Sequence, residues 1–298
     1  MQKMAVSFPD VISTEKTKGS IISVYSVNVG TLRINGIWVI LYTEGRCVVN
    51  SLGPFEGERL EDLQLAGMCI LQKDHGFRFG MDSVLLADFV RMGRHDKAAD
   101  FGTGSGVLPF LLLGRDKGLS FEAFEIQPEM ADMAARSVAL NGLSDRIRVH
   151  CMDVADAHTL LGYETMDAVV CNPPYGLPGS AMVNPDPVRA VSRHQQDEGL
   201  LRFLKAAFRV LRVRGRFSMI YPAQRMLEAM EQMDSVRLTP KRLRMVYPSR
   251  DKAANLVLIE AQKEAGALLH QEPPLIIREM DGSESEELRR IYHMEREA

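Results

Sequence analysis

The sequence predicts an α/β fold with a seven-stranded, mostly parallel sheet whose last strand is reversed. Three observations lead to this prediction. Short apolar runs alternate with helical patterns from Gly57 onward, as in sheets with crossover helices. A glycine-rich turn follows the first of the expected strands. The last two runs follow each other directly across Pro248-Ser249-Arg250-Asp251, which predicts an antiparallel hairpin.

The expected elements alternate along the chain. Strands are expected near residues 97–101, 120–125, 146–151, 166–171, 215–221, 239–247 and 254–262. Helices are expected near residues 82–92, 106–115, 128–141, 197–212, 222–233 and 284–293. The α/β domain is therefore predicted to occupy residues 51–265, and residues 266–298 to form a tail with a short helix.

Residues 1–50 are expected to form a small N-terminal β extension. Apolar runs cover residues 20–25, 31–34 and 37–42, and Asn35-Gly36 between the last two is a strong signal of a β-hairpin. A start codon assigned too far upstream would leave an unrelated prefix at the same place, and the sequence leaves both explanations open.

Composition limits the class of protein. The chain has 298 residues, of which 46% are hydrophobic and 25% charged, as expected for a soluble α/β domain with small additions. No run approaches the ~20 apolar residues of a membrane span, and no secretory signal is visible, so a cytoplasmic protein is expected. The four cysteines lack C-x-x-C spacing and the seven histidines are scattered, so neither a disulfide nor a metal site is expected.

Charge is distributed unevenly. The net charge is only -3, but residues 189–252 contain fifteen Lys or Arg and six Asp or Glu. This excess suggests a surface that faces phosphate, with Arg242 and Arg244 as expected contacts. Solvated helix faces explain the same excess equally well when it is taken alone.

The run Asp100-Phe101-Gly102-Thr103-Gly104-Ser105-Gly106 predicts a cofactor site. Such a turn delivers the chain to a helix N-terminus at the carboxyl edge of the sheet, where ligands of open α/β folds bind. Dinucleotide sites have the spacing G-x-G-x-x-G, whereas D-x-G-x-G-x-G is the form used for the amino-acid moiety of S-adenosylmethionine. The expected contacts are Asp100, Gly102, Thr103, Gly104 and Gly106.

Acidic residues end the next two strands. Glu125 lies about twenty residues after the glycines, where a carboxylate can accept both ribose hydroxyls, and Ile126 is assigned to the same site. Asp153 follows the third strand and can accept from the amine of the cofactor's adenine. A helix cap or loop carboxylate would be favoured for either acid alone, but three acids at consecutive strand ends favour the cofactor.

The fourth strand runs into Asn172-Pro173-Pro174-Tyr175, which predicts methyl transfer to a planar nitrogen. The lone pair of an adenine or amide nitrogen is delocalised, so the nitrogen must become more tetrahedral to react. The Asn172 side-chain oxygen and the Pro173 carbonyl can accept from its two N–H bonds and favour that geometry. Tyr175 offers a face for stacking an extruded base, at ~1–3 kcal/mol. The alternative is an ordinary Asn-Pro turn.

The loop over residues 176–196 is too long for a plain connection and is expected to be a substrate lid or a target-recognition loop. Arg189, Arg193 and His194 lie near its end and are candidates for phosphate contacts. Solvated charge or a helix cap is an equal alternative for each of them.

Residues 57–293 resemble the bacterial tRNA1(Val) adenine-N6 methyltransferase family. The resemblance rests on residues 77–87, the glycine turn, Cys171 to Tyr175, Arg193-His194, Tyr247-Pro248 and residues 287–292. It implies the class I methyltransferase, Rossmann-like fold, S-adenosylmethionine as cofactor, and a cytoplasmic enzyme acting on RNA. It also implies that the segment with Phe79 and Asp82 covers the cofactor, although Asp82 and Ser83 could simply cap the helix that follows.

The expected reaction is methyl transfer to the N6 amine of an adenine in RNA, with tRNA as the expected partner. Four alternatives remain: a glutamine amide of a peptide-release factor, a DNA adenine, a guanine N2 of ribosomal RNA, and a cofactor-binding protein without catalysis. Release-factor enzymes usually carry a helical N-terminal domain, the guanine enzymes often have Phe where Tyr175 stands, and no separate DNA-recognition domain is visible.

Overall fold

The computed structural model describes residues 52–74, 80–115, 118–174 and 193–293, together with the five short strands of residues 13–49. Side chains are described for residues 52–74, 80–115, 118–174 and 199–292. The chain divides into two compact units, residues 1–60 and 61–298, so the first unit extends beyond the expected boundary at residue 50.

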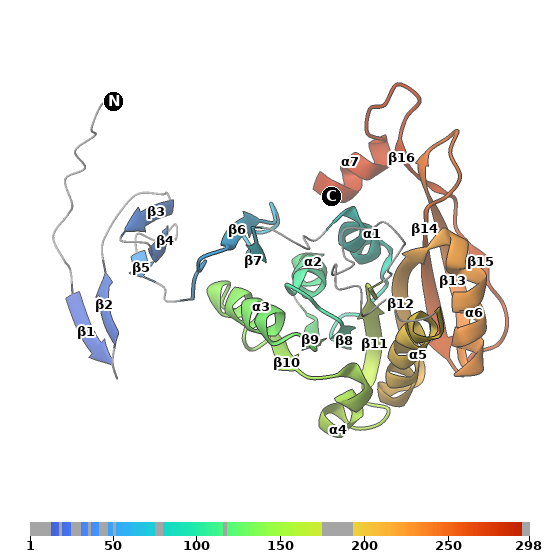
Figure 1. The fold of residues 1–298 in the computed structure, drawn as a ribbon, viewed down its shortest axis with the longest axis horizontal. Helices are drawn as coiled ribbons and strands as arrows, with labels where there is room; N and C mark the ends of the chain where they lie inside the picture. Colours follow the sequence, from blue (N-terminus) through green and yellow to red (C-terminus); the bar gives the residue numbers. More distant parts are fainter. Residues whose placement is uncertain are drawn as a thin grey trace. The chain divides into compact units, whose positions relative to one another are not determined.

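The first unit is built from antiparallel strands (Figure 1). Strands β1 (Ser13–Thr17) and β2 (Ser20–Val24) form one pair, and β3 (Thr31–Ile34), β4 (Ile37–Leu41) and β5 (Cys47–Val49) form a three-stranded sheet. The register pairs Ile34 with Ile37, which confirms the hairpin predicted from Asn35-Gly36.

The second unit contains a nine-stranded sheet in the order β10-β9-β8-β11-β12-β14-β13-β15, with β16 also paired to β13. Its strands are β8 (Lys97–Phe101), β9 (Ser120–Glu125), β10 (Ile147–Cys151), β11 (Met166–Cys171), β12 (Leu211–Pro222), β13 (Leu238–Ser249), β14 (Leu256–Lys263), β15 (His270–Gln271) and β16 (Leu275–Arg278). Strand β14 alone runs antiparallel to its neighbours, β12 and β13. The predicted seven strands and the reversed last strand are therefore confirmed, and β15 and β16 extend the sheet.

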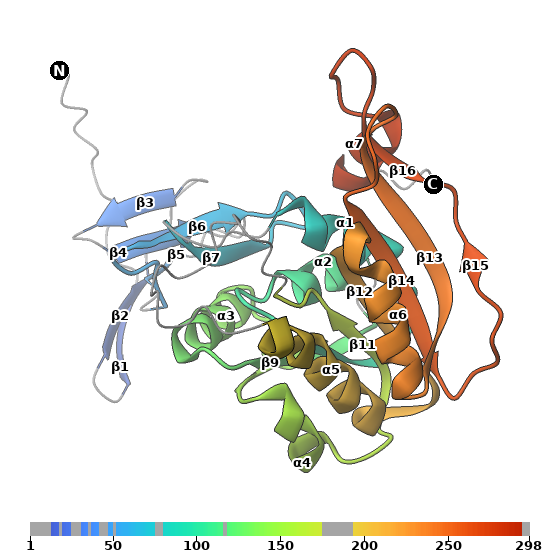
Figure 2. The ribbon, with the colours of Figure 1, turned by 45° about the vertical axis from the view of Figure 1, so that its right-hand side comes forward.

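Helices cover both faces of this sheet (Figures 1 and 2). They are α1 (Met81–Phe89), α2 (Val107–Arg115), α3 (Pro128–Leu140), α4 (Ala157–Leu161), α5 (Arg193–Val210), α6 (Met226–Ser235) and α7 (Glu286–His293), with short 3₁₀ helices η1 (Val154–Asp156) and η3 (Ala223–Arg225). In the described parts of the chain, no helix combines the length and apolar character needed to cross a membrane.

Two hydrophobic cores lie on the two faces of the sheet. Helices α1, α2 and α7 contribute to one core, and α5 and α6 to the other. Successive strand residues alternate between them: Val170 belongs to the first core, and Val169 and Cys171 to the second. This alternation follows from the two-residue period of a strand, and it explains why the central strands are apolar throughout.

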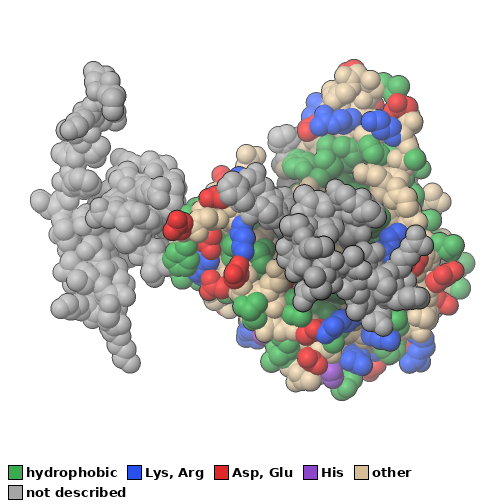
Figure 3. Space-filling model, in the orientation of Figure 1, with side chains coloured by type: hydrophobic (Ala, Val, Ile, Leu, Met, Phe, Trp, Pro, Cys, Tyr) green, Lys and Arg blue, Asp and Glu red, His purple; other side chains and the backbone are tan. Residues whose placement is uncertain are grey.

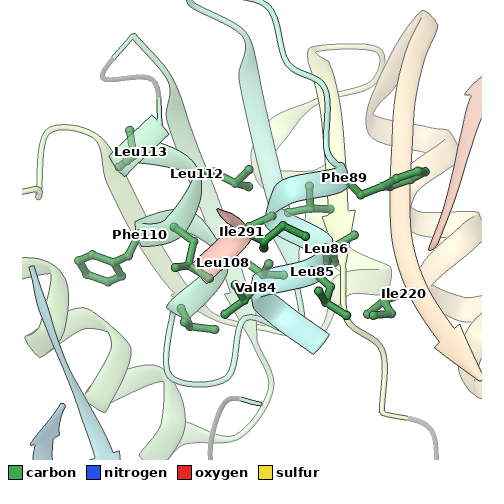
Figure 4. Close-up of a cluster of buried hydrophobic side chains, with 14 of the residues drawn as sticks. Val84, Leu85, Leu86, Phe89, Leu108, Phe110, Leu112, Leu113, Ile220 and Ile291 are labelled. Carbon is green, nitrogen blue, oxygen red and sulfur yellow. The ribbon is translucent and has the colours of Figure 1, made fainter. Parts of the chain in front are cut away.

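The C-terminal helix packs against the helix that begins beside the carboxyl edge of the sheet. Ile291 of α7 lies among Val84 and Leu85 of α1 and Leu108 of α2 (Figure 4), and all four side chains are buried. The tail is therefore part of the second unit's core.

Strand β7 is held along α3 by polar side chains. Strand β6 (Glu58–Asp62) pairs with β7 (Cys69–Lys73). The Cys69 N–H donates to Asn141 at 3.0 Å, the Leu71 N–H donates to Ser137 at 2.9 Å, and Lys73 Nζ donates to Glu129 at 2.5 Å. Because Asn141 and Glu129 stand at opposite ends of α3, β7 leads the chain toward the beginning of this helix, next to the site described below.

Candidate active site

A cavity of about 690 Å³ lies at the carboxyl edge of the sheet, within the usual size range of small-molecule sites. It brings together nine of the predicted residues: Asp82, Gly102, Gly104, Glu125, Ile126, Asp153, Asn172, Pro173 and Pro174. It also contains Lys73, Arg202 and Phe203, which the sequence reasoning missed. The carboxyl ends of parallel strands meet at one edge of a sheet, which explains why motifs far apart in the sequence converge here.

The glycine turn needs glycine for two different reasons. Gly104 and Gly106 both have the left-handed backbone that other residues rarely adopt, with φ of 58° and 88°. A Cβ on Gly106 would lie 3.4 Å from Ala134 of α3, so this glycine allows close packing between the turn and that helix. A Cβ on Gly104 would meet no atom within 4 Å, so Gly104 leaves free space on the cavity side.

Asp100 lies buried beneath the turn and does not line the cavity. One of its oxygens accepts from the Thr103 hydroxyl at 2.5 Å, while Oδ1 has no hydrogen-bond partner within the described residues. Burial raises the pKa of Asp100 to about 7; the Thr103 hydrogen bond opposes this rise and the charge of Glu125 adds to it. Asp100 and Thr103 therefore hold the shape of the turn.

Glu125 is fixed at the end of β9 by the backbone. Its Oε2 accepts from the Gly104 N–H and its Oε1 from the Gln127 N–H, both at 2.9 Å. Each carboxylate oxygen has two lone pairs, so each retains one that can accept from a ribose hydroxyl. The hydrogen bond to Gly104 also links the predicted ribose ligand directly to the glycine turn.

The expected adenine end of the cavity combines an apolar and a charged group. The Ile126 side chain is 61% exposed although it is large and apolar, as expected for a surface that a flat ring would cover. Asp153 accepts from the Ala155 N–H at 2.9 Å, so it also has the helix-cap role considered from the sequence. It forms a two-point ion pair with Arg202, whose Nε lies 2.9 Å from Oδ1.

Asn172 follows β11 and lies beside the beginning of α1. Its amide nitrogen is 3.5 Å from the buried Ser83 hydroxyl, a long hydrogen bond that leaves the amide oxygen available as an acceptor. Helix α1 has Gly80 at its N-cap and no capping side chain, so Asp82 and Ser83 lie in its first turn instead of capping it. Both instead face functional groups: Asp82 lines the cavity and Ser83 contacts Asn172.

Several predicted contacts lie outside the described residues. These are Phe79, Tyr175 and Arg189, and the side chains of Arg193 and His194, which begin α5. Their proposed roles stay predictions. No group of three or more His, Cys, Asp or Glu in the described parts of the chain could hold a metal ion.

The predicted phosphate contacts at Arg242 and Arg244 are wrong. Arg242 is 4% exposed, pairs with Glu260 and Glu272 at 3.1 and 3.2 Å, and lies over the Phe89 ring. Arg244 donates to Glu287 at 2.7 Å and to a backbone carbonyl. Strand β13 is flanked by β14 on one side and by β15 and β16 on the other, so its arginines are engaged within the protein.

Comparisons with known proteins agree with this architecture. The methyltransferase small domain family matches residues 78–238, which is more than half of the chain. A protein of Porphyromonas gingivalis named tRNA1(Val) (adenine(37)-N6)-methyltransferase is 29% identical over 191 residues, covering 61% of this chain and 73% of the relative. A protein of Tolumonas auensis with the same name is 25% identical over 211 residues, covering 70% of this chain and 86% of the relative.

A solved structure shows the same fold. It is described as a predicted O-methyltransferase, protein Atu636 from Agrobacterium tumefaciens. Its identity to this chain is 25% and the TM-score is 0.59, with coverage of 71% of this chain and 95% of the other.

The residues present fit S-adenosylmethionine. The cofactor requires close backbone approach at its amino-acid end, acceptors for a ribose diol and an apolar surface for adenine, and Gly104, Glu125 and Ile126 offer these in one cavity. With its fold, its cofactor cavity and a family match over more than half of its length, this chain belongs to the methyltransferase small domain family and is an S-adenosylmethionine-dependent methyltransferase.

Proposed function

We propose that this enzyme methylates the N6 amine of an adenine in RNA, with tRNA as the substrate. One observation carries the proposal: Asn172 and Pro173 line the cofactor cavity immediately after β11. The contact of the Asn172 amide nitrogen with Ser83 leaves Oδ1 as the free acceptor. An acceptor pair of this kind suits an amine with two N–H bonds.

The reaction requires little from the protein beyond positioning the acceptor nitrogen next to the methyl group. The cofactor supplies a methyl group on a sulfonium, whose sulfur leaves as a neutral thioether when the new N–C bond forms. Asn172 Oδ1 and the Pro173 carbonyl accept from the two N–H bonds and turn the nitrogen lone pair toward the methyl carbon. The extra proton leaves the nitrogen afterwards, so no base with a shifted pKa is required. Tyr175 stacks on the extruded adenine and keeps its amine in reach.

The relatives support the acceptor class. Both named relatives are called adenine-N6 methyltransferases of tRNA1(Val), and they align with most of this chain. The name of the similar solved structure points to an oxygen acceptor instead. The Asn-Pro-Pro-Tyr run favours nitrogen, because a hydroxyl acceptor has a single O–H bond and a free lone pair and does not need two acceptors. A tRNA substrate also places the enzyme in the cytoplasm.

Product analysis tests the proposal. The purified protein is incubated with methyl-labelled S-adenosylmethionine and, separately, with unmodified tRNA, a DNA duplex and a peptide-release factor. Nuclease digestion of the tRNA is expected to release labelled N6-methyladenosine. Label recovered as methylglutamine, as an O-methyl product or only from DNA would overturn the proposal. The Asn172→Ala variant controls for contaminating activity.

A further inference from the structure

We infer that one face of helix α5, together with a second cavity at its end, binds the phosphate backbone of the RNA substrate. This inference rests on the proposed function, because it requires a polynucleotide acceptor. The face is formed by Arg202, Lys205 and Arg209, and we call it the α5 basic face.

The α5 basic face connects two cavities. Arg202 lines the cofactor cavity, whereas Lys205 and Arg209 line a second cavity of about 260 Å³. Residues at i, i+3 and i+7 lie on the same side of a helix, and seven residues span about 10 Å. A strand of RNA whose target base enters the active site can therefore place neighbouring phosphates along this face.

The second cavity is cationic. It lies between α5 and the end of α6 and is lined by Lys205, Phe208, Arg209, Ser235, Val236 and Arg237. Three of these six residues are cations, and none of the described residues that line the cavity is acidic. Arg237 is 69% exposed and pairs with Glu264 at 3.0 Å, and its guanidinium lies 5.0 Å from the centre of the Phe208 ring, so Lys205 and Arg209 supply the uncompensated charge of this cavity.

Two of the three charges of this face, those of Lys205 and Arg209, lack a carboxylate partner among the described residues. Eight of the fifteen cations of residues 189–252 have carboxylate partners: Arg202, Arg212, Arg216, Arg225, Arg237, Arg242, Arg244 and Arg250. In contrast, Lys205 has no hydrogen bond or ion pair within the described part of the chain. Among the residues whose side chains are described, Arg209 donates to the Ala155 carbonyl alone, at 3.3 Å, which neutralises no charge.

A merely solvated helix face would look different. Exposed helix faces usually mix acids and bases at i, i+3 and i+4, because like charges at this spacing repel. The exposed positions of α5 between residues 199 and 210 are Gly199 and the three members of the α5 basic face, and the two acids of this helix, Asp197 and Glu198, both precede that span. Several Lys and Arg side chains are visible over the α5 region in Figure 3. An anion bound along the face would remove this repulsion.

The test is the double variant Lys205→Glu/Arg209→Glu, compared with Arg94→Glu. Arg94 is also exposed, but it precedes β8 at the opposite edge of the sheet from the cofactor cavity. The dissociation constant for unmodified tRNA is measured by filter binding from low to high salt, and that for S-adenosylmethionine by calorimetry. The double variant is expected to bind tRNA at least about tenfold more weakly, with a salt slope shallower by about one to two. Cofactor affinity is expected to be unchanged, and Arg94→Glu to match the wild type in both measurements.

The possible results separate this inference from the proposed function. Wild-type protein that methylates tRNA, with a double variant of equal tRNA affinity and salt slope, would overturn the inference and leave the function standing. Wild-type protein that transfers methyl to a release factor and not to RNA would overturn both. If the Glu substitutions impair folding, the double variant Lys205→Gln/Arg209→Gln removes the same two charges with less repulsion. Weaker tRNA binding by this variant would support the inference, and an unchanged tRNA affinity would overturn it.

Discussion

Replacing Glu125 by glutamine should weaken cofactor binding and also destabilise the fold, although the two side chains have the same shape. Both carboxylate oxygens accept from backbone N–H groups, those of Gly104 and Gln127. In Glu125→Gln, an NH2 group replaces one oxygen and faces one of these N–H donors, which leaves that donor without an acceptor. The substitution therefore disrupts the glycine turn as well as the predicted ribose contact.

The structure sets the size of both effects. A buried N–H without an acceptor costs about 1–3 kcal/mol, which corresponds to roughly 2–12 °C in melting temperature for a unit of this size. A lost ribose hydrogen bond to a charged acceptor is worth ~1.5–3 kcal/mol, or roughly a 10- to 100-fold rise in the dissociation constant for S-adenosylmethionine. Thermal melting without ligand measures the first effect and titration calorimetry the second.

Glu122→Gln is the matched control. Glu122 lies on the same strand, but it pairs with His150 and Arg148 and does not line the cofactor cavity. It should leave the affinity for S-adenosylmethionine unchanged. An affinity of Glu125→Gln within about twofold of the wild type would refute the assignment of Glu125 as the ribose ligand.

Three further predictions concern buried charge and the acceptor site. Burial raises the pKa of Asp100 from 3.8 to about 7, so the folded state keeps a proton that the unfolded state releases, and stability should fall as pH rises through this window. Melting curves of Asp100→Asn should lack this part of the decline; curves parallel to the wild type would contradict it. In urea, Arg242→Ala should cost about 3–5 kcal/mol, because it leaves the largely buried carboxylate of Glu260 unpaired, whereas Arg250→Ala at an exposed pair should cost less than ~1 kcal/mol; equal losses would argue against the buried network. Asn172→Ala should keep cofactor affinity and lower methyl transfer by roughly 10²–10³-fold; unchanged turnover would exclude its role.

The central strands could be predicted closely because they are buried on both faces. Strands β9 and β11 have the predicted bounds, and each is a short run whose residues are mostly buried. Strand β12 begins earlier than predicted. Its first residues include Arg212 and Arg214, which are exposed and charged, so they do not resemble a buried strand in the sequence. Strands β15 and β16 were missed because they are short; the two residues of β15 are polar and exposed, and it forms only by pairing with β13.

The residues of the site also include some that could be predicted from the sequence and one, Arg202, that could not. The glycine turn, Glu125, Asp153 and Asn172 could be found because each stands at the end of a strand, in a local sequence pattern that the chemistry requires. Arg202 could not be found, because its partner Asp153 lies 49 residues away and only the packing of α5 beside η1 brings them together. Nothing in the local sequence of α5 distinguishes Arg202 from the other cations of the basic stretch.

Counting charges along the chain gave a wrong prediction at Arg242 for a physical reason. A count of Lys and Arg along the chain does not show which of them meet carboxylates from distant segments, and Glu260, Glu272 and Glu287 neutralise the arginines of β13 after folding. What attracts phosphate is the charge that remains exposed and unpaired. By that criterion Lys205 and Arg209 of the α5 basic face differ from the arginines of β13, because neither has a carboxylate partner among the described residues and both line an open cavity.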